Sequence, residues 1–190
     1  MPAALLILNL IDDLAGSRGR ANHSVQQFTE RNVIKRVNTA TAYARVRKIP
    51  VIWSRVGFSE DYQDMAAHSP LFAQIKLIGA LRLNSPGCAW LHSLEIDAGD
   101  WQFTHTGLSA FTGNNLLTWL QQHQRRRLLI GGISTSLAVE STVREAHDRG
   151  IPATVMEDLC ADNSLLSHQQ SIDNLQRIAE ITTTSHWMQP

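Results

Sequence analysis

The segment Leu128–Gly150 reads LLIGGISTSLAVESTVREAHDRG, and its three successive parts decide the fold. It opens with the apolar run Leu128–Ile130, which predicts a strand buried on both faces. The glycine pair 131–132 then predicts a turn at which a ligand can approach the backbone closely. Residues Ala138–Arg149 follow as a predicted helix. A strand, a glycine turn and a helix start in this order are typical of a binding site.

Charge pairing and a terminal glycine support the helix. Glu140 with Arg144 and Glu145 with Arg149 are acid–base pairs spaced to meet on one helix face, and Gly150 stands where a helix usually ends. The first turn of such a helix has backbone N–H groups without intrahelical partners. These groups predict a small anion or oxyanion pocket at the helix start.

The hydroxyl residues before the helix have no base beside them in the sequence, and the segment contains no cysteine. Thr135 and Ser136 are expected to cap the helix. Ser134, Thr135 and the backbone of Leu137 are also expected to contact a ligand, because they follow the strand end directly. The segment therefore predicts a binding turn that lacks a nucleophile.

Strands and helices alternate along the rest of the chain. Further apolar runs predict strands at Ala4–Leu8, Pro50–Trp53, Trp101–Thr104, Pro152–Met156 and Ile181–Ser185. Helices are predicted from the capping-box pattern at Ser24–Gln27 to about Lys48, at Asn114–Gln124 and at Ser167–Ala179. This alternation predicts an α/β fold with a parallel sheet and helices on both faces. The irregular segment Arg55–Gly99 is too apolar for a disordered linker, so it is expected to close over a site or to make a subunit contact.

Length and composition indicate a single globular domain spanning residues 1–190. The formal net charge is zero, so no nucleic-acid partner is expected. No segment has the length or pattern of a membrane span or a signal peptide, so no membrane association is expected. Cys88 and Cys160 are too few and too far apart for a disulfide framework or a zinc site. A reducing, cytoplasmic location is therefore expected.

The carboxyl ends of the predicted strands supply the candidate site, because ligands of such sheets bind at that edge. The polar and small residues at these ends are Asn9, Asp12, Asp13, Ser54, Arg55, His105, Gly132–Ala138, Glu157 and Asp158.

Three stretches resemble the isochorismatase-like cysteine hydrolases, a family that includes nicotinamidases and N-carbamoylsarcosine amidohydrolases. They are the opening ALLILNLIDDL at residues 4–14, the segment Thr104–Leu116, and GISTSLAVEST at residues 132–142 with Glu157-Asp158 farther on. The resemblance implies a three-layer Rossmann-like fold with six parallel strands in the order 3-2-1-4-5-6. It also implies a homo-oligomer, a dimer or larger.

The resemblance further implies an Asp–Lys–Cys catalytic triad, and this chain departs from it at every position. Asn9 stands at the Asp position, His105 at the Lys position and Ala138 at the Cys position. An amide cannot take up a proton near neutral pH and an alanine has no nucleophile, so thiol catalysis is not expected. His105 is the one residue of the three that is expected to titrate near neutrality.

Three functions follow from these substitutions. The first is a small-molecule pocket for a carbonyl or carboxylate compound without cysteine-dependent hydrolysis, in which Arg55 also lines the pocket. The second is noncovalent acid–base hydrolysis through His105 or Asp13. Asp13 lies where the family commonly has a second acid, and its structural role is to bind backbone N–H groups after the first strand. The third is an interaction or regulatory oligomer. No cofactor and no metal are expected, since His68 and His92 lack a carboxylate at ligand spacing.

Overall fold

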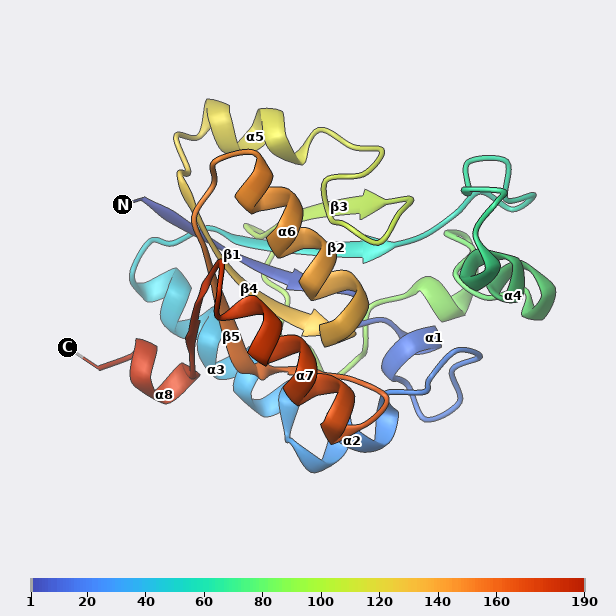
Figure 1. Cartoon of the computed structure of the whole chain (residues 1–190), viewed down its shortest axis with the longest axis horizontal. Helices are drawn as coiled ribbons and strands as arrows, with labels where there is room; N and C mark the ends of the chain where they lie inside the picture. Colours follow the sequence, from blue (N-terminus) through green and yellow to red (C-terminus); the bar gives the residue numbers. More distant parts are fainter. Residues whose placement is uncertain (1, 190) are drawn as a thin grey trace.

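The computed structural model describes residues 2–189 and contains a six-stranded sheet in the order β3-β2-β1-β4-β5-β6. Every neighbouring pair of strands is parallel, and helices cover both faces (Figure 1). The predicted fold class and strand order are therefore confirmed. The strands are β1 (Ala3–Leu8), β2 (Val51–Val56), β3 (Trp101–His105), β4 (Arg127–Ile133), β5 (Ala153–Ala161) and β6 (Glu180–Thr182).

The helices lie between and after these strands. They are α1 (Asp12–Ala15), α2 (Val25–Glu30), α3 (Val33–Val46), α4 (Pro70–Ile78), α5 (Leu116–Gln122), α6 (Glu140–Asp148), α7 (Leu165–Leu175) and α8 (Thr184–Trp187). A short 3-10 turn spans Pro86–Cys88, and a π-helical turn spans Thr135–Val139 directly before α6. No helix within residues 2–189 is long and apolar enough to cross a membrane.

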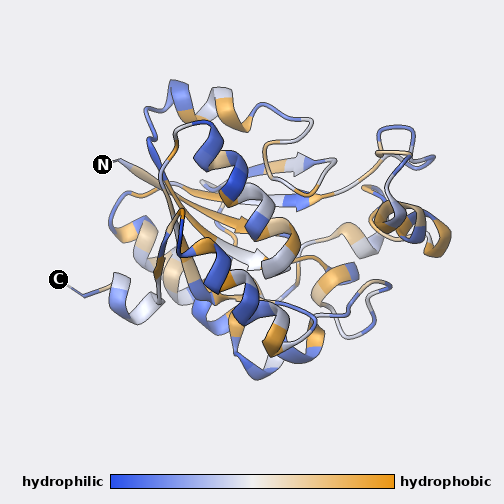
Figure 2. Cartoon of the chain, in the orientation of Figure 1, coloured by the Kyte–Doolittle hydropathy of each residue, from blue (hydrophilic) through white to orange (hydrophobic). Residues whose placement is uncertain are grey.

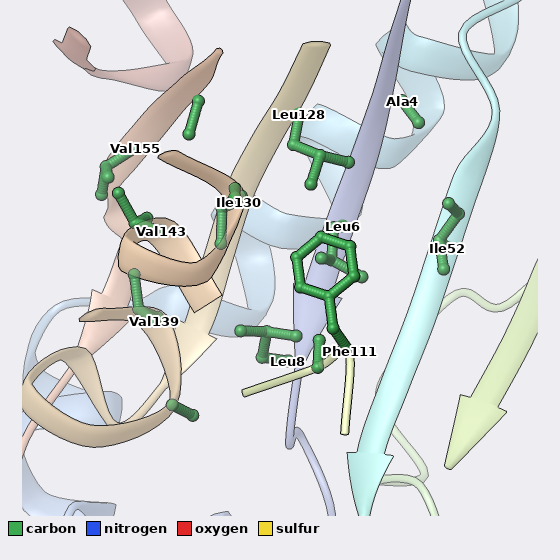
Figure 3. Close-up of a cluster of buried hydrophobic side chains, with 14 of the residues drawn as sticks. Ala4, Leu6, Leu8, Ile52, Phe111, Leu128, Ile130, Val139, Val143 and Val155 are labelled. Carbon is green, nitrogen blue, oxygen red and sulfur yellow. The ribbon is translucent and has the colours of Figure 1, made fainter. Parts of the chain in front are cut away.

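Strand β1 lies at the centre of the core because its side chains alternate between two apolar layers. Leu6 and Leu8 point to the layer formed with α5, α6 and α7, where they pack near Ile130 and Val143 (Figure 3). The intervening residues of β1, beginning with Leu5, pack into the layer formed with α3. Each fully buried leucine contributes about 1.5–3 kcal/mol of hydrophobic stabilisation. Figure 2 shows the same division, with apolar strands inside and polar outer helix faces.

The glycine pair does not form the predicted turn. Strand β4 continues through Gly131 and Gly132 to Ile133, and the register with β5 shifts between Ile130 and Gly132. A Cβ atom on Gly131 would lie 2.6 Å from Leu159 Cβ, and one on Gly132 would collide with the β1 backbone. Gly132 also has a φ of +133°, which side-chain-bearing residues rarely adopt. The glycines therefore allow strands to approach one another, and the prediction of a ligand-approach turn here was wrong.

The single long helix predicted from Ser24 to Lys48 is two helices. Asn32 has a left-handed backbone with φ of 52°, and this conformation separates α2 from α3. The predicted capping box is wrong as well, because the Ser24 side chain accepts no capping hydrogen bond. The break leaves Arg31 at the end of α2, with its guanidinium directed to the carbonyls of Glu157 and Cys160.

The irregular segment between β2 and β3 is ordered around α4, which stands away from the body of the molecule (Figure 1). Ser69 caps this helix by accepting from Phe72 N, and Gly79 ends it with φ of 66°. Phe72 and Phe58 pack at a ring distance of 5.1 Å within a separate apolar cluster. This cluster gives α4 its own support beside the carboxyl ends of the strands.

Candidate functional site

A cavity of about 480 Å³ lies at the carboxyl ends of β1 and β4, between the π-helical turn and α4. Its lining is mainly apolar, and polar groups come from the strand ends. The lining includes Asn9, Ser134, Ser136, Leu137, Ala138, Asp162 and Asn163, together with the apolar side chains of Leu71, Ile75, Ile78 and Leu108. A larger, more open groove of about 1130 Å³ runs along α2 and α3, and its lining includes none of the three predicted triad positions.

Asn9 lines the cavity, but its amide is bonded to the strand ends. Its Oδ1 accepts from Val56 N at 2.7 Å, and its Nδ2 donates to Ile133 O at 3.0 Å. The residue is buried and has a φ of 61°, a left-handed conformation that asparagine tolerates better than most residues. Asn9 therefore fastens β1 to the ends of β2 and β4, while leaving a donor hydrogen on Nδ2.

Ala138 lies in the π-helical turn and presents a methyl group to the cavity. The peptide between Ile133 and Ser134 is cis. Val139 N donates to Ser134 O at 3.1 Å, a bond that spans five residues and widens the first turn. Leu137 and Ala138 stand between Ser134 and Val139 in the sequence. Their backbone N–H groups belong to the first turn, so they have no helical carbonyl four residues earlier to bond. Backbone donors therefore remain beside the alanine.

His105 does not behave as the sequence predicted. It is fully buried, it does not line the cavity, and its Nδ1 pairs with Ser54 Oγ at 2.8 Å. Its Nε2 has no hydrogen-bond partner among the described residues. Burial lowers the pKa of His105 to about 3. The imidazole is thus neutral near pH 7, and the expectation that it titrates there was wrong.

Asp13 and Arg55 also lie outside the cavity lining. The Asp13 carboxylate accepts from Leu81 N at 2.8 Å and from Arg20 N at 3.3 Å, which is the structural role expected for it. Arg55 donates to Cys88 O at 2.8 Å, and its guanidinium carbon lies 5.3 Å from the Trp90 ring centroid. Both side chains hold the irregular segment against the strand ends.

A buried polar chain supports the π-helical turn from behind. Thr135 is fully buried, and its hydroxyl lies 2.8 Å from His168 Nδ1. His168 Nε2 lies 3.5 Å from Glu157 Oε2, and Arg31 bonds the same oxygen at 2.9 Å. The hydrogen bond from His168, together with Arg31, lowers the pKa of Glu157 despite its burial. Thr135 is absent from the cavity lining, and its side chain does not cap the helix as predicted.

The Ser136 side chain does not cap the helix either. Instead, the Asp162 carboxylate accepts from the backbone N–H of Ser136 at the start of the helix. Asp162 Oδ2 accepts from Ser136 N at 2.6 Å, and Oδ1 accepts from Asn163 N at 2.8 Å. Asp162 is absent from the predicted site residues because the apolar pattern predicts a fifth strand that ends at Met156. Strand β5 continues to Ala161, so the residue after the strand is Asp162.

The two cysteines are buried, and their thiols are poorly suited to act as nucleophiles. Burial raises the pKa of the Cys88 thiol to about 11 and that of the Cys160 thiol to about 12. Neither cysteine lines the cavity. Within residues 2–189, no group of three or more His, Cys, Asp or Glu side chains is arranged to hold a metal ion.

Comparisons with known proteins agree with this fold. Residues 3–186 match the model of the isochorismatase domain. An uncharacterised isochorismatase family protein, YecD of Escherichia coli O157:H7, is 30% identical over 158 residues, which cover 80% of each chain. The ureidoacrylate amidohydrolase RutB of Cronobacter sakazakii is 26% identical over 142 residues, and the match covers 66% of this chain but only 60% of RutB. The crystal structure of an isochorismatase family protein from Desulfovibrio vulgaris has a TM-score of 0.87 at 17% identity, covering 98% and 96% of the two chains.

Proposed function

Because the chain belongs to the isochorismatase family, we propose that it binds a small carbonyl compound in the cavity at the strand ends without cysteine-dependent hydrolysis. The observation that carries the proposal is Ala138. It lines the cavity beside the backbone donors of the π-helical turn, at the position where the family's nucleophile is expected. The backbone can still bind a carbonyl oxygen there, but no side chain can attack the carbonyl carbon.

Thiol chemistry from another position receives no support. Cys88 and Cys160 are fully buried, and the raised pKa of each thiol disfavours the thiolate. The alternative of noncovalent acid–base hydrolysis is also weakly supported. His105 is neutral and enclosed, and the Asp13 carboxylate is directed to backbone N–H groups outside the cavity. The arrangement therefore favours binding over turnover.

Binding and turnover can be measured on the same sample with 4-methylbenzamide as the probe. We expect saturable binding by calorimetry, no release of ammonia, and loss of binding in Ala138→Leu, which fills the cavity. Ala98→Leu, at an exposed loop position, is the matched control. If Ala138→Leu does not fold, blocking by Leu108→Trp at the cavity mouth replaces it. Ammonia release that iodoacetamide abolishes would overturn the proposal, as would unchanged binding in the blocked variants.

The cavity mouth supports a second part of the proposal, a homo-oligomer. Leu71, Ile78, Leu108 and Leu137 all line the cavity and are 37–42% exposed. Large apolar side chains gathered at one opening favour coverage by another protein surface. Light scattering after size exclusion tests this part directly, and a monomer at micromolar concentration would contradict it.

A further inference from the structure

The cavity lining contains an acidic side chain but no lysine or arginine among its described residues. Asp162 is the only carboxylate, and His23 is an exposed residue at the opening. An anionic ligand would therefore enter an apolar space without a cationic side chain to receive it. The one carboxylate and the absence of basic side chains in the described lining favour a cationic over an anionic ligand.

Asp162 is a buried carboxylate without an ion partner. It is 3% exposed and takes part in none of the ion pairs formed among residues 2–189. Its two oxygens each accept one backbone N–H, from Ser136 and Asn163. A carboxylate has about four acceptor positions, so lone pairs remain on both oxygens. Burying such a group is costly unless its charge is compensated.

The local backbone gives only part of that compensation. The positive end of the π-helical turn and α6 favours a negative charge, and Asp162 provides one. Bonding Ser136 N requires only an oxygen acceptor, which an asparagine or a serine also offers. The negative charge of Asp162 therefore exceeds what the turn needs. It also occupies the positive helix end at which a ligand carboxylate would otherwise bind.

We infer that the ligand of this cavity carries a protonated amine, whose N–H groups donate to Asp162 while its apolar body packs against Leu108 and Leu137. This inference rests on the proposed function and narrows it, since it selects an ammonium-bearing carbonyl compound over a carboxylate. Charge-assisted hydrogen bonds to the buried Asp162 carboxylate supply the selectivity.

A matched set of three para-substituted benzamides tests the inference on the full-length protein. They are 4-(aminomethyl)benzamide, which is a cation, 4-methylbenzamide, which is neutral, and 4-carbamoylbenzoate, which is an anion. We expect the cation to bind at least about tenfold more tightly than the neutral compound, as charge-assisted bonds do, and the anion to bind most weakly. The amide signals of Ser136 and Asn163 should shift with the cation and not with the neutral compound.

The variant Asp162→Asn removes the charge and keeps one oxygen acceptor. The preference for the cation should fall to less than about threefold in it, because only neutral hydrogen bonding remains. Asp148→Asn makes the same charge change on a side chain that is 81% exposed on α6, and it should keep the full preference. If Asp162→Asn does not fold, the affinity order and the two amide signals in the wild type decide the question.

The outcomes separate this inference from the proposal beneath it. Binding of the neutral compound without a preference for the cation overturns the ammonium inference and leaves the proposed function standing. A preference that persists in Asp162→Asn also overturns it. If none of the three benzamides binds, the proposed function fails and the inference fails with it.

Discussion

The two sides of the turn Ser134–Val139 have different compositions and different roles. The front side lines the cavity with Ser136, the exposed Leu137 and Ala138, which offer a hydroxyl and backbone N–H groups but no thiol. The back side holds the buried chain from Thr135 through His168 to Glu157. The difference teaches that the geometry of this turn is maintained from behind, so residues on the front can change without unfolding it.

The largest expected effect is on the back side. His168→Leu leaves the Thr135 hydroxyl and the Glu157 carboxylate without a shared partner. We expect the free energy of unfolding to fall by about 3 kcal/mol, because the buried Thr135 hydroxyl loses its partner and Glu157 Oε2 keeps only Arg31. Urea denaturation measures the loss. His147→Leu, at a side chain that is 54% exposed, is the control and should change stability by less than about 0.5 kcal/mol. Equal losses in the two variants would show that the buried chain does not hold the turn.

An effect that is small near pH 7 and grows in acid concerns His105, which the sequence placed at the front and the structure places in the interior. Its pKa is about 3 in the folded protein and near 6.5 in the unfolded chain. Between these values the unfolded chain binds the proton more readily, so stability falls as the pH falls. The slope from this residue is at most about 1.4 kcal/mol per pH unit.

Unfolding measured from pH 7 to pH 4 in wild type and His105→Asn tests this expectation. The variant should show a shallower decline, and His92→Asn, at an exposed position, should match the wild type. An imidazole signal of His105 that moves between pH 6 and pH 8 in the folded protein would refute the enclosed, neutral state.

The smallest expected effect on stability is at the front. Leu137 is 40% exposed, so Leu137→Ala should lower the free energy of unfolding by only about 0.5 kcal/mol. The same variant should weaken the binding of 4-methylbenzamide severalfold, since part of the apolar lining is lost. Leu77→Ala is the control, because Leu77 is exposed on α4 and absent from the cavity lining. A large stability loss in Leu137→Ala with unchanged binding would show that the front side of the turn supports the fold and does not bind the ligand.

Much of the fold could be predicted because the buried strands are continuous apolar runs, as in Ala3–Leu8. The lengths of the strands could not be predicted in the same way. A strand such as β5 continues through polar residues when it forms backbone hydrogen bonds with a neighbouring strand. Because the predicted strand ended too early, Asp162 was not recognised as a residue at a strand end. The two glycines of β4 were misread because close strand approach and ligand approach require the same residue. Asn9 and Ala138 could be placed at the site from the resemblance, whereas the burial of His105 depends on tertiary packing that spacing does not reveal.

The amide of Asn9 has a consequence for replacing this residue by an acid. Its two ends match two groups of opposite character, the N–H of Val56 and the carbonyl of Ile133. In Asn9→Asp the second oxygen would face the Ile133 carbonyl, and two acceptors repel unless a proton lies between them. The new acid would then hold its proton at neutral pH, so it would donate a hydrogen bond instead of acting as a base. Placing a carboxylate base here therefore requires changing the contact with the Ile133 carbonyl as well as the residue itself.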